Sequence, residues 1–246
     1  MIWSVISVVL LLIVTYITLF FVWRKIDQEH LDGIESFFDV IFKSSLVAYA
    51  AGRIGDVLLS VRFPISSITQ LWSSGFSSVS IPLLIAGFFV AFYRFSIPHW
   101  KDRFHLLDLI SIGMACWLSL CFLCLTIVGI RPFIGASTVS VSLVTSLVLP
   151  AVFALLFGLL FVLLTQLEQV YRTFMWYRYR RSSAQSGFVV AAFMAGGGIL
   201  LLARLILFEG LKFNFSVIGE LIVTLLFILS GFIILYIRSG RFKLRS

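Results

Sequence analysis

Apolar runs of about 17–25 residues recur along the entire chain, and a run of that length can cross the hydrocarbon core of a bilayer as a helix. The 246 residues are 61% hydrophobic and only 12% charged, whereas soluble domains hold about 45–50% apolar and about 25% charged residues. No segment between the runs is long enough to fold as a soluble domain. The sequence therefore predicts one all-α transmembrane domain over residues 1–246.

Seven spans are expected from the hydropathy pattern. They lie near residues 2–23, 36–61, 79–95, 106–129, 138–166, 187–209 and 216–237. The first run is longer than the about 7–15-residue apolar core of a signal peptide, so we expect it to be retained. The third run is the weakest because Pro82 stands near its start, and it is either a span or a re-entrant segment.

The basic residues gather in alternate connections, which hold thirteen of the nineteen. The opposite connections hold only Arg62, Arg131 and Lys212. Because cytoplasmic loops are enriched in Lys and Arg, the amino terminus is predicted outside and the carboxyl terminus in the cytoplasm. The net charge of +8 thus indicates topology rather than nucleic-acid binding, since no basic face with stacking aromatics is present.

The sequence contains no close group of residues that would suggest a metal site or the active site of a soluble enzyme. The three cysteines share one apolar run and are expected to be buried core thiols: Cys116, Cys121 and Cys124. The three histidines lie in connections or at span ends and are expected to be solvated: His30, His99 and His105. Lys43, near the cytoplasmic end of its span, is expected to extend to the interface. The sequence predicts neither a metal site nor a cofactor.

Ionisable residues inside spans cost at least about 2.5–3.5 kcal/mol at the bilayer centre, so they usually face a protein interior or a wet cavity. In the second span Tyr49, Arg53 and Asp56 follow at spacings of four and three residues. This spacing places them on one helix face, with Ser45 one turn further along it. Arg53 and Asp56 are close enough to form an ion pair.

The sixth span combines close-packing glycines with charge. Gly196, Gly197 and Gly198 permit close helix contact, and Arg204 and Glu209 follow. Under the predicted topology, the charged residues of both spans lie in the outer half of the membrane, with Arg131 and Trp72 at the same surface. They are expected to form a pocket whose guanidinium groups bind a phosphate head group, or else ion pairs that fix helix packing, or to be long side chains that extend to the interface.

Several stretches, in order along the chain, resemble the bacterial prolipoprotein diacylglyceryl transferase family. They are AGRIGDVLL at 51–59, LWSSGFS at 71–77, HLLDLI at 105–110, the stretch from Gly198 to Leu211, which is similar to the family's sixth-helix Gly-x-x-Arg…Glu pattern, and GEL at 219–221 with Gly231. Two family signatures are absent. Residues 79–87 lack the family's histidine, and residues 119–125 lack its arginine and asparagine.

The resemblance implies seven helices in a bacterial inner membrane and transfer of a diacylglyceryl group from phosphatidylglycerol to the lipobox cysteine of a prolipoprotein. Its expected partners are phosphatidylglycerol or another anionic phospholipid and a prolipoprotein signal peptide. The residues expected to bind the head group are Arg53, Arg204, Arg131, Trp72 and Tyr49. Those expected to assist deprotonation of the cysteine are Glu209 and Asp56. Arg131 is the candidate to replace the missing family arginine.

Two other functions stay open from the sequence. The chain could be a non-catalytic relative that binds lipid or a partner helix, since both central signatures are absent. It could instead be a transporter or channel subunit in which the same charged residues line a path. The absence of an internal repeat in the sequence disfavours the transporter.

Overall fold

Seven stretches of the chain are described by the computed structural model: residues 2–28, 34–59, 81–100, 103–129, 147–172, 186–209 and 215–238. Each stretch contains one α-helix, so the all-helical prediction is confirmed for this part of the chain. The helices are α1 (Ile2–Gln28), α2 (Ile34–Leu59), α4 (Ile81–Phe95), α5 (Arg103–Gly129), α6 (Leu149–Arg172), α7 (Phe188–Glu209) and α8 (Phe215–Arg238).

Two helices continue past the ends that hydropathy predicts. Helix α1 reaches Gln28 rather than residue 23, and α6 reaches Arg172 rather than residue 166. Hydropathy predicts a helix end where polar residues begin. The backbone hydrogen bonds of the helix can continue beyond that point, because polar side chains there can reach partners or solvent. The predicted start of the fifth span, residues 138–146, lies outside the described residues.

Five helices within the described stretches are long and apolar enough to cross a membrane. They contain the segments Val9–Gln28, Arg103–Ile127, Leu149–Val170, Phe188–Leu207 and Val217–Arg238. The outer faces of these helices are apolar as well: Leu155 is 75% exposed, and Leu229 is 57% exposed. A helix at the surface of a soluble protein carries polar residues on that face. The chain therefore has the character of a multi-pass membrane protein.

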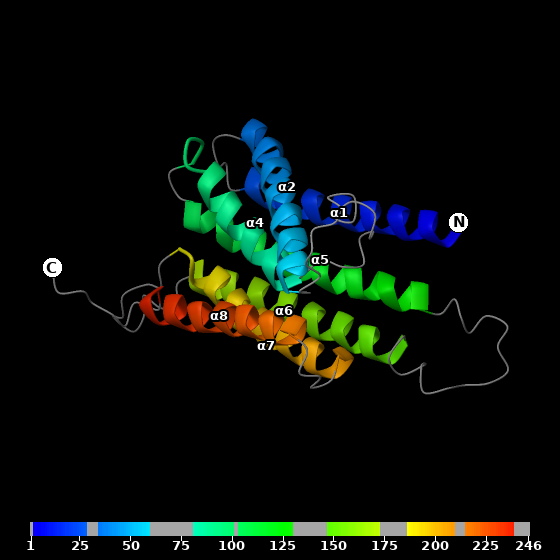
Figure 1. The fold of residues 1–246 in the computed structure, drawn as a ribbon. Coiled ribbons are helices and arrows are strands. Elements are labelled where there is room, and N and C mark those ends of the chain that lie inside the picture. Colours follow the sequence, from blue (N-terminus) through cyan, green and yellow to red (C-terminus); the bar gives the residue numbers. More distant parts are fainter. Residues whose placement is uncertain are drawn as a thin grey trace, which may run out of the picture.

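Helix α5 is the centre of the bundle. It packs against α1 on one side and against α6 and α7 on the other, and α8 packs on α7. The axes of these five helices lie roughly parallel across Figure 1, and helices that follow one another along the chain run in opposite directions. Large apolar side chains fill the space between them, and Leu109, Phe157 and Phe193 are fully buried.

Helices α2 and α4 form a separate antiparallel pair that crosses the other five at an angle (Figure 1). Gly87 of α4 permits their close approach, because a Cβ atom there would lie 2.8 Å from the Cβ of Ala51 on α2. The fifteen residues of α4 span about 22 Å at 1.5 Å per residue, less than the about 30 Å of a hydrocarbon core. Pro82 occupies the first turn of α4, where its missing N–H has no helical partner to lose.

The predicted role of the sixth-span glycines is confirmed. A Cβ atom at Gly198 on α7 would meet the side chains of Phe227 and Ile228 on α8, and one at Gly196 would meet Leu160 on α6. From the opposite side, Gly231 of α8 lies against the α7 backbone at Ala195. Small residues let helix backbones approach closely in membrane proteins, so these positions set the distance between α7 and its neighbours.

Candidate functional site

Arg53 is almost completely buried, with 5% of its surface exposed. The buried stripe of α2 runs through Val40, Ser44 and Ala48, and Arg53 follows Ala48 by five residues, so it is buried on a different side of the helix, the side that carries Tyr49. The pair formed by α2 and α4 also contacts α8. Burying a guanidinium group is costly unless the charge meets hydrogen-bonding or anionic partners, which makes Arg53 the strongest candidate among the predicted site residues.

The predicted stripe of Tyr49, Arg53 and Asp56 is shown only in part. Tyr49 is 39% exposed whereas Arg53 is buried, although their four-residue spacing places both on the same side of α2. Asp56 belongs to α2, but its side chain lies outside the described part of the chain. Its ion pair with Arg53 stays a prediction.

The remaining predicted residues come from other parts of the chain. Arg204 is half-buried on α7, and Glu209 is the last residue of that helix, with its side chain outside the described part. Trp72 and Arg131 also lie outside the described residues. Helix α8 packs against both α2 and α7, so one helix connects the two that carry Arg53 and Arg204. The shared pocket for these residues stays a prediction.

A large apolar cavity of about 610 Å³, hereafter the lipid cavity, lies between α1, α2, α4 and α5. Its lining residues are Thr15, Thr18, Leu19, Val22, Phe38, Ile41, Phe42, Ser45, Ala48, Tyr49, Leu84, Phe88, Ile110, Gly113, Met114 and Trp117. Helices α1 and α2 contact each other only slightly, and the cavity occupies the space between them. Phe42 on its border is 65% exposed, so the cavity opens toward the surroundings of the bundle.

Among the described residues, the wall of the lipid cavity contains no charged side chain and few hydroxyl groups. Two of those hydroxyls are already engaged: Thr15 accepts a hydrogen bond from Trp117 Nε1 at 3.2 Å, and Thr18 donates to the backbone oxygen of Val14 at 2.9 Å. Along α2 the wall extends from Phe38 to Tyr49, about 17 Å at the rise of a helix. Its shape and chemistry suit a hydrocarbon chain.

Arg53 lies one helical turn beyond Tyr49, at the end of the α2 wall. The sequence analysis identified both residues but not the cavity, because its other walls come from α1, α4 and α5. Tyr49 lines this cavity, and its predicted role in binding a head group stays a prediction. A buried cation therefore lies next to an apolar space. A binding site for an anionic lipid needs both, the cation for the phosphate group and the apolar space for an acyl chain.

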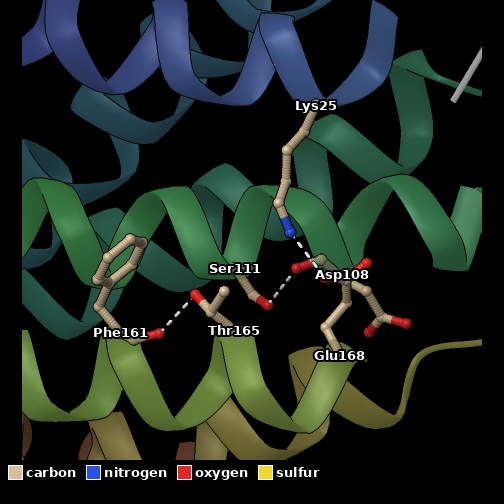
Figure 2. A network of polar contacts seen from close by, with 6 residues as sticks. All are labelled: Lys25, Asp108, Ser111, Phe161, Thr165 and Glu168. Atoms are coloured by element: carbon tan, nitrogen blue, oxygen red, sulfur yellow. Dashed lines mark hydrogen bonds and ion pairs between the residues drawn. The ribbon is translucent and has the colours of Figure 1, made fainter. Parts of the chain in front are cut away.

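A buried ion pair that the sequence analysis missed joins α1 to α6. Lys25 Nζ lies 2.6 Å from Glu168 Oε2, and the two side chains are only 20% and 5% exposed. Figure 2 shows Lys25 reaching from α1 toward Glu168 on α6. Both residues stand just beyond the predicted span ends. The sequence did contain a signal for this burial. Lys25 follows Val22 by three residues and Glu168 follows Leu164 by four, so each lies on the same helix face as an apolar residue of its run.

Asp108 is a second buried polar residue, and the resemblance alone had drawn attention to it. Its Oδ2 accepts a hydrogen bond from the backbone N–H of Gly187 at 2.7 Å, and its Oδ1 accepts one from Val190 at 2.8 Å. Gly187 is the residue before α7 and Val190 lies in its first turn, where the backbone N–H groups have no intrahelical acceptor. Gly187 has a φ of 98°, which favours glycine. Asp108 therefore caps α7 from the neighbouring α5.

Two expectations about burial are wrong. His105 is not a solvated loop residue, since it lies in the first turn of α5 and is 9% exposed. The helix begins earlier than hydropathy predicts, which carries His105 into the packed part of the bundle. The three cysteines are not fully buried core thiols: all are free and half-buried, because an apolar run facing lipid needs no protein cover on its outer side.

A comparison of the chain with protein-family models, with curated proteins and with solved structures finds no match.

Proposed function

We propose that this protein binds an anionic phospholipid in the membrane, with an acyl chain in the lipid cavity and the phosphate group near Arg53. The observation that carries the proposal is the position of this buried arginine one turn beyond a cavity of about 610 Å³. Ligand cavities commonly measure about 300–1,000 Å³ and combine apolar walls with a few polar groups. A guanidinium group is the side chain best suited to bind a phosphate through two hydrogen bonds.

The direction of α2 fits a lipid of the outer leaflet. Under the predicted topology, α2 runs from the cytoplasmic side outward, so Arg53 is nearer the outer surface than Phe38 is. A lipid with its phosphate at Arg53 would then direct its chain inward along the wall from Tyr49 to Phe38. The open border at Phe42 supplies a route from the bilayer into the cavity.

We place the amino terminus outside and the carboxyl terminus in the cytoplasm of a bacterial inner membrane. The basic residues of alternate connections support this orientation, and the start of α1 and the end of α8 lie at opposite ends of the bundle in Figure 1. Seven spans result if α2 and α4 both cross the membrane, and five if both return to the side where α2 begins. Either count is odd, so both counts place the two termini on opposite sides of the membrane.

The more specific form of the proposal is diacylglyceryl transfer, as the family resemblance implies. The thiolate of a lipobox cysteine would form a thioether bond to the glyceryl carbon of phosphatidylglycerol while the bond from that carbon to glycerol phosphate breaks. Glu209 or Asp56 would take the thiol proton. Arg53 and Arg204, with Arg131, would stabilise the departing phosphate. The lipid cavity supports this form because the substrate's acyl chains need an apolar site beside the reacting head group.

Filling the lipid cavity is expected to remove bound lipid. Ser45→Trp introduces a large side chain at an exposed lining position, so phospholipid that co-purifies with the full chain should fall about tenfold, because the added ring occupies the space of the acyl chain. The matched control is Val162→Trp on the outer face of α6, where the residue is 46% exposed. Mass spectrometry of extracted lipid measures the effect. Equal lipid content in the two variants would contradict the proposal.

Transferase activity has its own test. The full chain, expressed in a bacterial strain that lacks the ordinary enzyme, is expected to attach diacylglyceryl to a lipobox peptide. Arg53→Gln should lower the rate by about 100-fold or more, since it removes the charge that stabilises the leaving phosphate. Arg24→Gln, an exposed position on α1, is the control. No product from a well-expressed wild-type chain that still retains phospholipid would exclude the transferase and leave the lipid-binding function.

A further inference from the structure

A second cavity, of about 300 Å³, lies where the first half of α2 faces the end of α4. We call it the cationic cavity, because the described residues that line it include Lys43, Arg94 and His99 and only one acidic residue, Asp39. It occupies a different face of α2 from the lipid cavity: Val40 and Lys43 line the cationic cavity, whereas Ile41 and Phe42 line the lipid cavity. The two are therefore separate sites.

The basic groups of the cationic cavity come from two helices and a turn. Lys43 belongs to α2, Arg94 to the last turn of α4, and His99 to the turn that follows. Extension of a single side chain to the interface explains one cation at a helix end. It does not explain why basic side chains from both helices converge on the same hollow.

Lys43 remains available to a ligand although it has an acidic neighbour. Its Nζ lies 2.6 Å from Asp39 Oδ2 one turn away, and the two side chains are 54% and 51% exposed. Exposed pairs of this kind contribute little because water screens them. An anion held by Arg94 as well would therefore compete effectively with Asp39 for the ammonium group.

The turn that carries His99 has a fixed shape. The backbone N–H of His99 donates to the carbonyl oxygen of Ser96 at 3.1 Å, and Ser96 Oγ donates to the carbonyl oxygen of Tyr93 at 2.9 Å. The His99 ring lies against the ring of buried Trp100, with centroids 5.6 Å apart. One wall of the cavity is thus held in place before any ligand binds, which lowers the cost of binding.

We infer that the cationic cavity binds a phosphate group. Arg94 supplies the planar fork that matches two phosphate oxygens, and Lys43 supplies a mobile point charge. Phe95 and Pro98 add an apolar border for the organic part of the ligand. The cavity lies at the end of the bundle where α1 ends and α5 begins, which is the cytoplasmic side under the proposed topology. The phosphate can belong to an inner-leaflet anionic lipid or to a soluble phosphate ester.

The test uses the purified full chain in detergent in two arms. Calorimetry with inorganic phosphate measures the soluble ligand, and native mass spectrometry with short-chain phosphatidylglycerol counts bound lipid, with short-chain phosphatidylcholine for comparison. Arg94→Gln is expected to weaken binding about tenfold in at least one arm, since one bidentate contact is lost. Arg24→Gln, an exposed cation on α1 outside the cavity, should leave both arms unchanged.

The arm that responds identifies the source of the phosphate. A response to inorganic phosphate indicates a soluble ester, and a response to phosphatidylglycerol alone indicates lipid. If Arg94→Gln weakens binding no more than Arg24→Gln in both arms, the cavity does not bind phosphate. Asp39→Asn supplies a second readout: it removes the competing carboxylate from Lys43 and should raise the affinity about threefold. Unchanged or lower affinity in that variant would contradict the inferred role of Lys43.

Discussion

Replacement of Asp108 by alanine is expected to lower the free energy of unfolding by about 2–4 kcal/mol. The carboxylate is 1% exposed and accepts hydrogen bonds from the backbone N–H groups of Gly187 and Val190. Without it, two donors at the start of α7 are buried without an acceptor. The negative charge that stabilises the N-terminus of that helix is lost as well. Unfolding of the purified chain by a denaturing detergent measures the change.

Two variants separate the cap from the general effect of a core substitution. Asp108→Asn keeps the shape and one acceptor oxygen but points an amide donor at a backbone donor, so it should fall between wild type and Asp108→Ala. Ser111→Ala removes a fully buried hydroxyl one turn further along α5 that donates to the carbonyl oxygen of Asp108 at 2.7 Å. It should cost about 1 kcal/mol or less. Equal losses for Ser111→Ala and Asp108→Ala would show that capping is not the cause.

Gly231→Ala is expected to destabilise the bundle by about 1–3 kcal/mol, although alanine ordinarily favours a helix interior over glycine by about 1 kcal/mol. A Cβ atom at this position would lie 2.6 Å from the backbone nitrogen of Ala195 and 2.9 Å from the backbone carbon of Met194 on α7. A backbone cannot rotate away as a side chain does, so α7 and α8 must separate. The change in apparent melting temperature measures the effect.

Gly196→Ala is the matched control for Gly231→Ala. Here the new Cβ atom would lie 3.1 Å from Cδ1 of Leu160, the far end of a flexible side chain that shifts at little cost. The gain in helix propensity should then prevail, and we expect unchanged or slightly higher stability. Equal destabilisation by both substitutions would show that close α7–α8 backbone contact is not what requires Gly231.

Helix positions were predictable because each apolar run contains its own signal. The structure has a helix at each of the seven predicted runs, and the sixth-span glycines pack closely as expected. The errors lie at the ends of helices. Hydropathy predicts an end where polar residues begin, whereas the hydrogen-bonded backbone of a helix can continue through polar residues. Glu168 was assigned to a connection for this reason, and His105 was expected in solvent.

The candidate site was predictable only in part. Arg53 stood out because a charged residue inside an apolar run is costly, and its burial agrees with that reasoning. The lipid cavity could not be predicted, since Thr15, Phe38, Leu84 and Trp117 come from four helices and form one wall only after packing. The cationic cavity depends in the same way on how α2 meets α4.

The sequence alone determined that the chain forms apolar helices suited to a bilayer and where its basic residues concentrate. Both properties are local, because a helix satisfies its backbone hydrogen bonds internally and its hydropathy is a property of one segment. The tertiary structure alone decided which polar groups meet. Lys25 and Glu168 are 143 residues apart, and Asp108 and Gly187 are 79 apart. Such pairs depend on the order and rotation of neighbouring helices, which the hydropathy of a single segment does not encode.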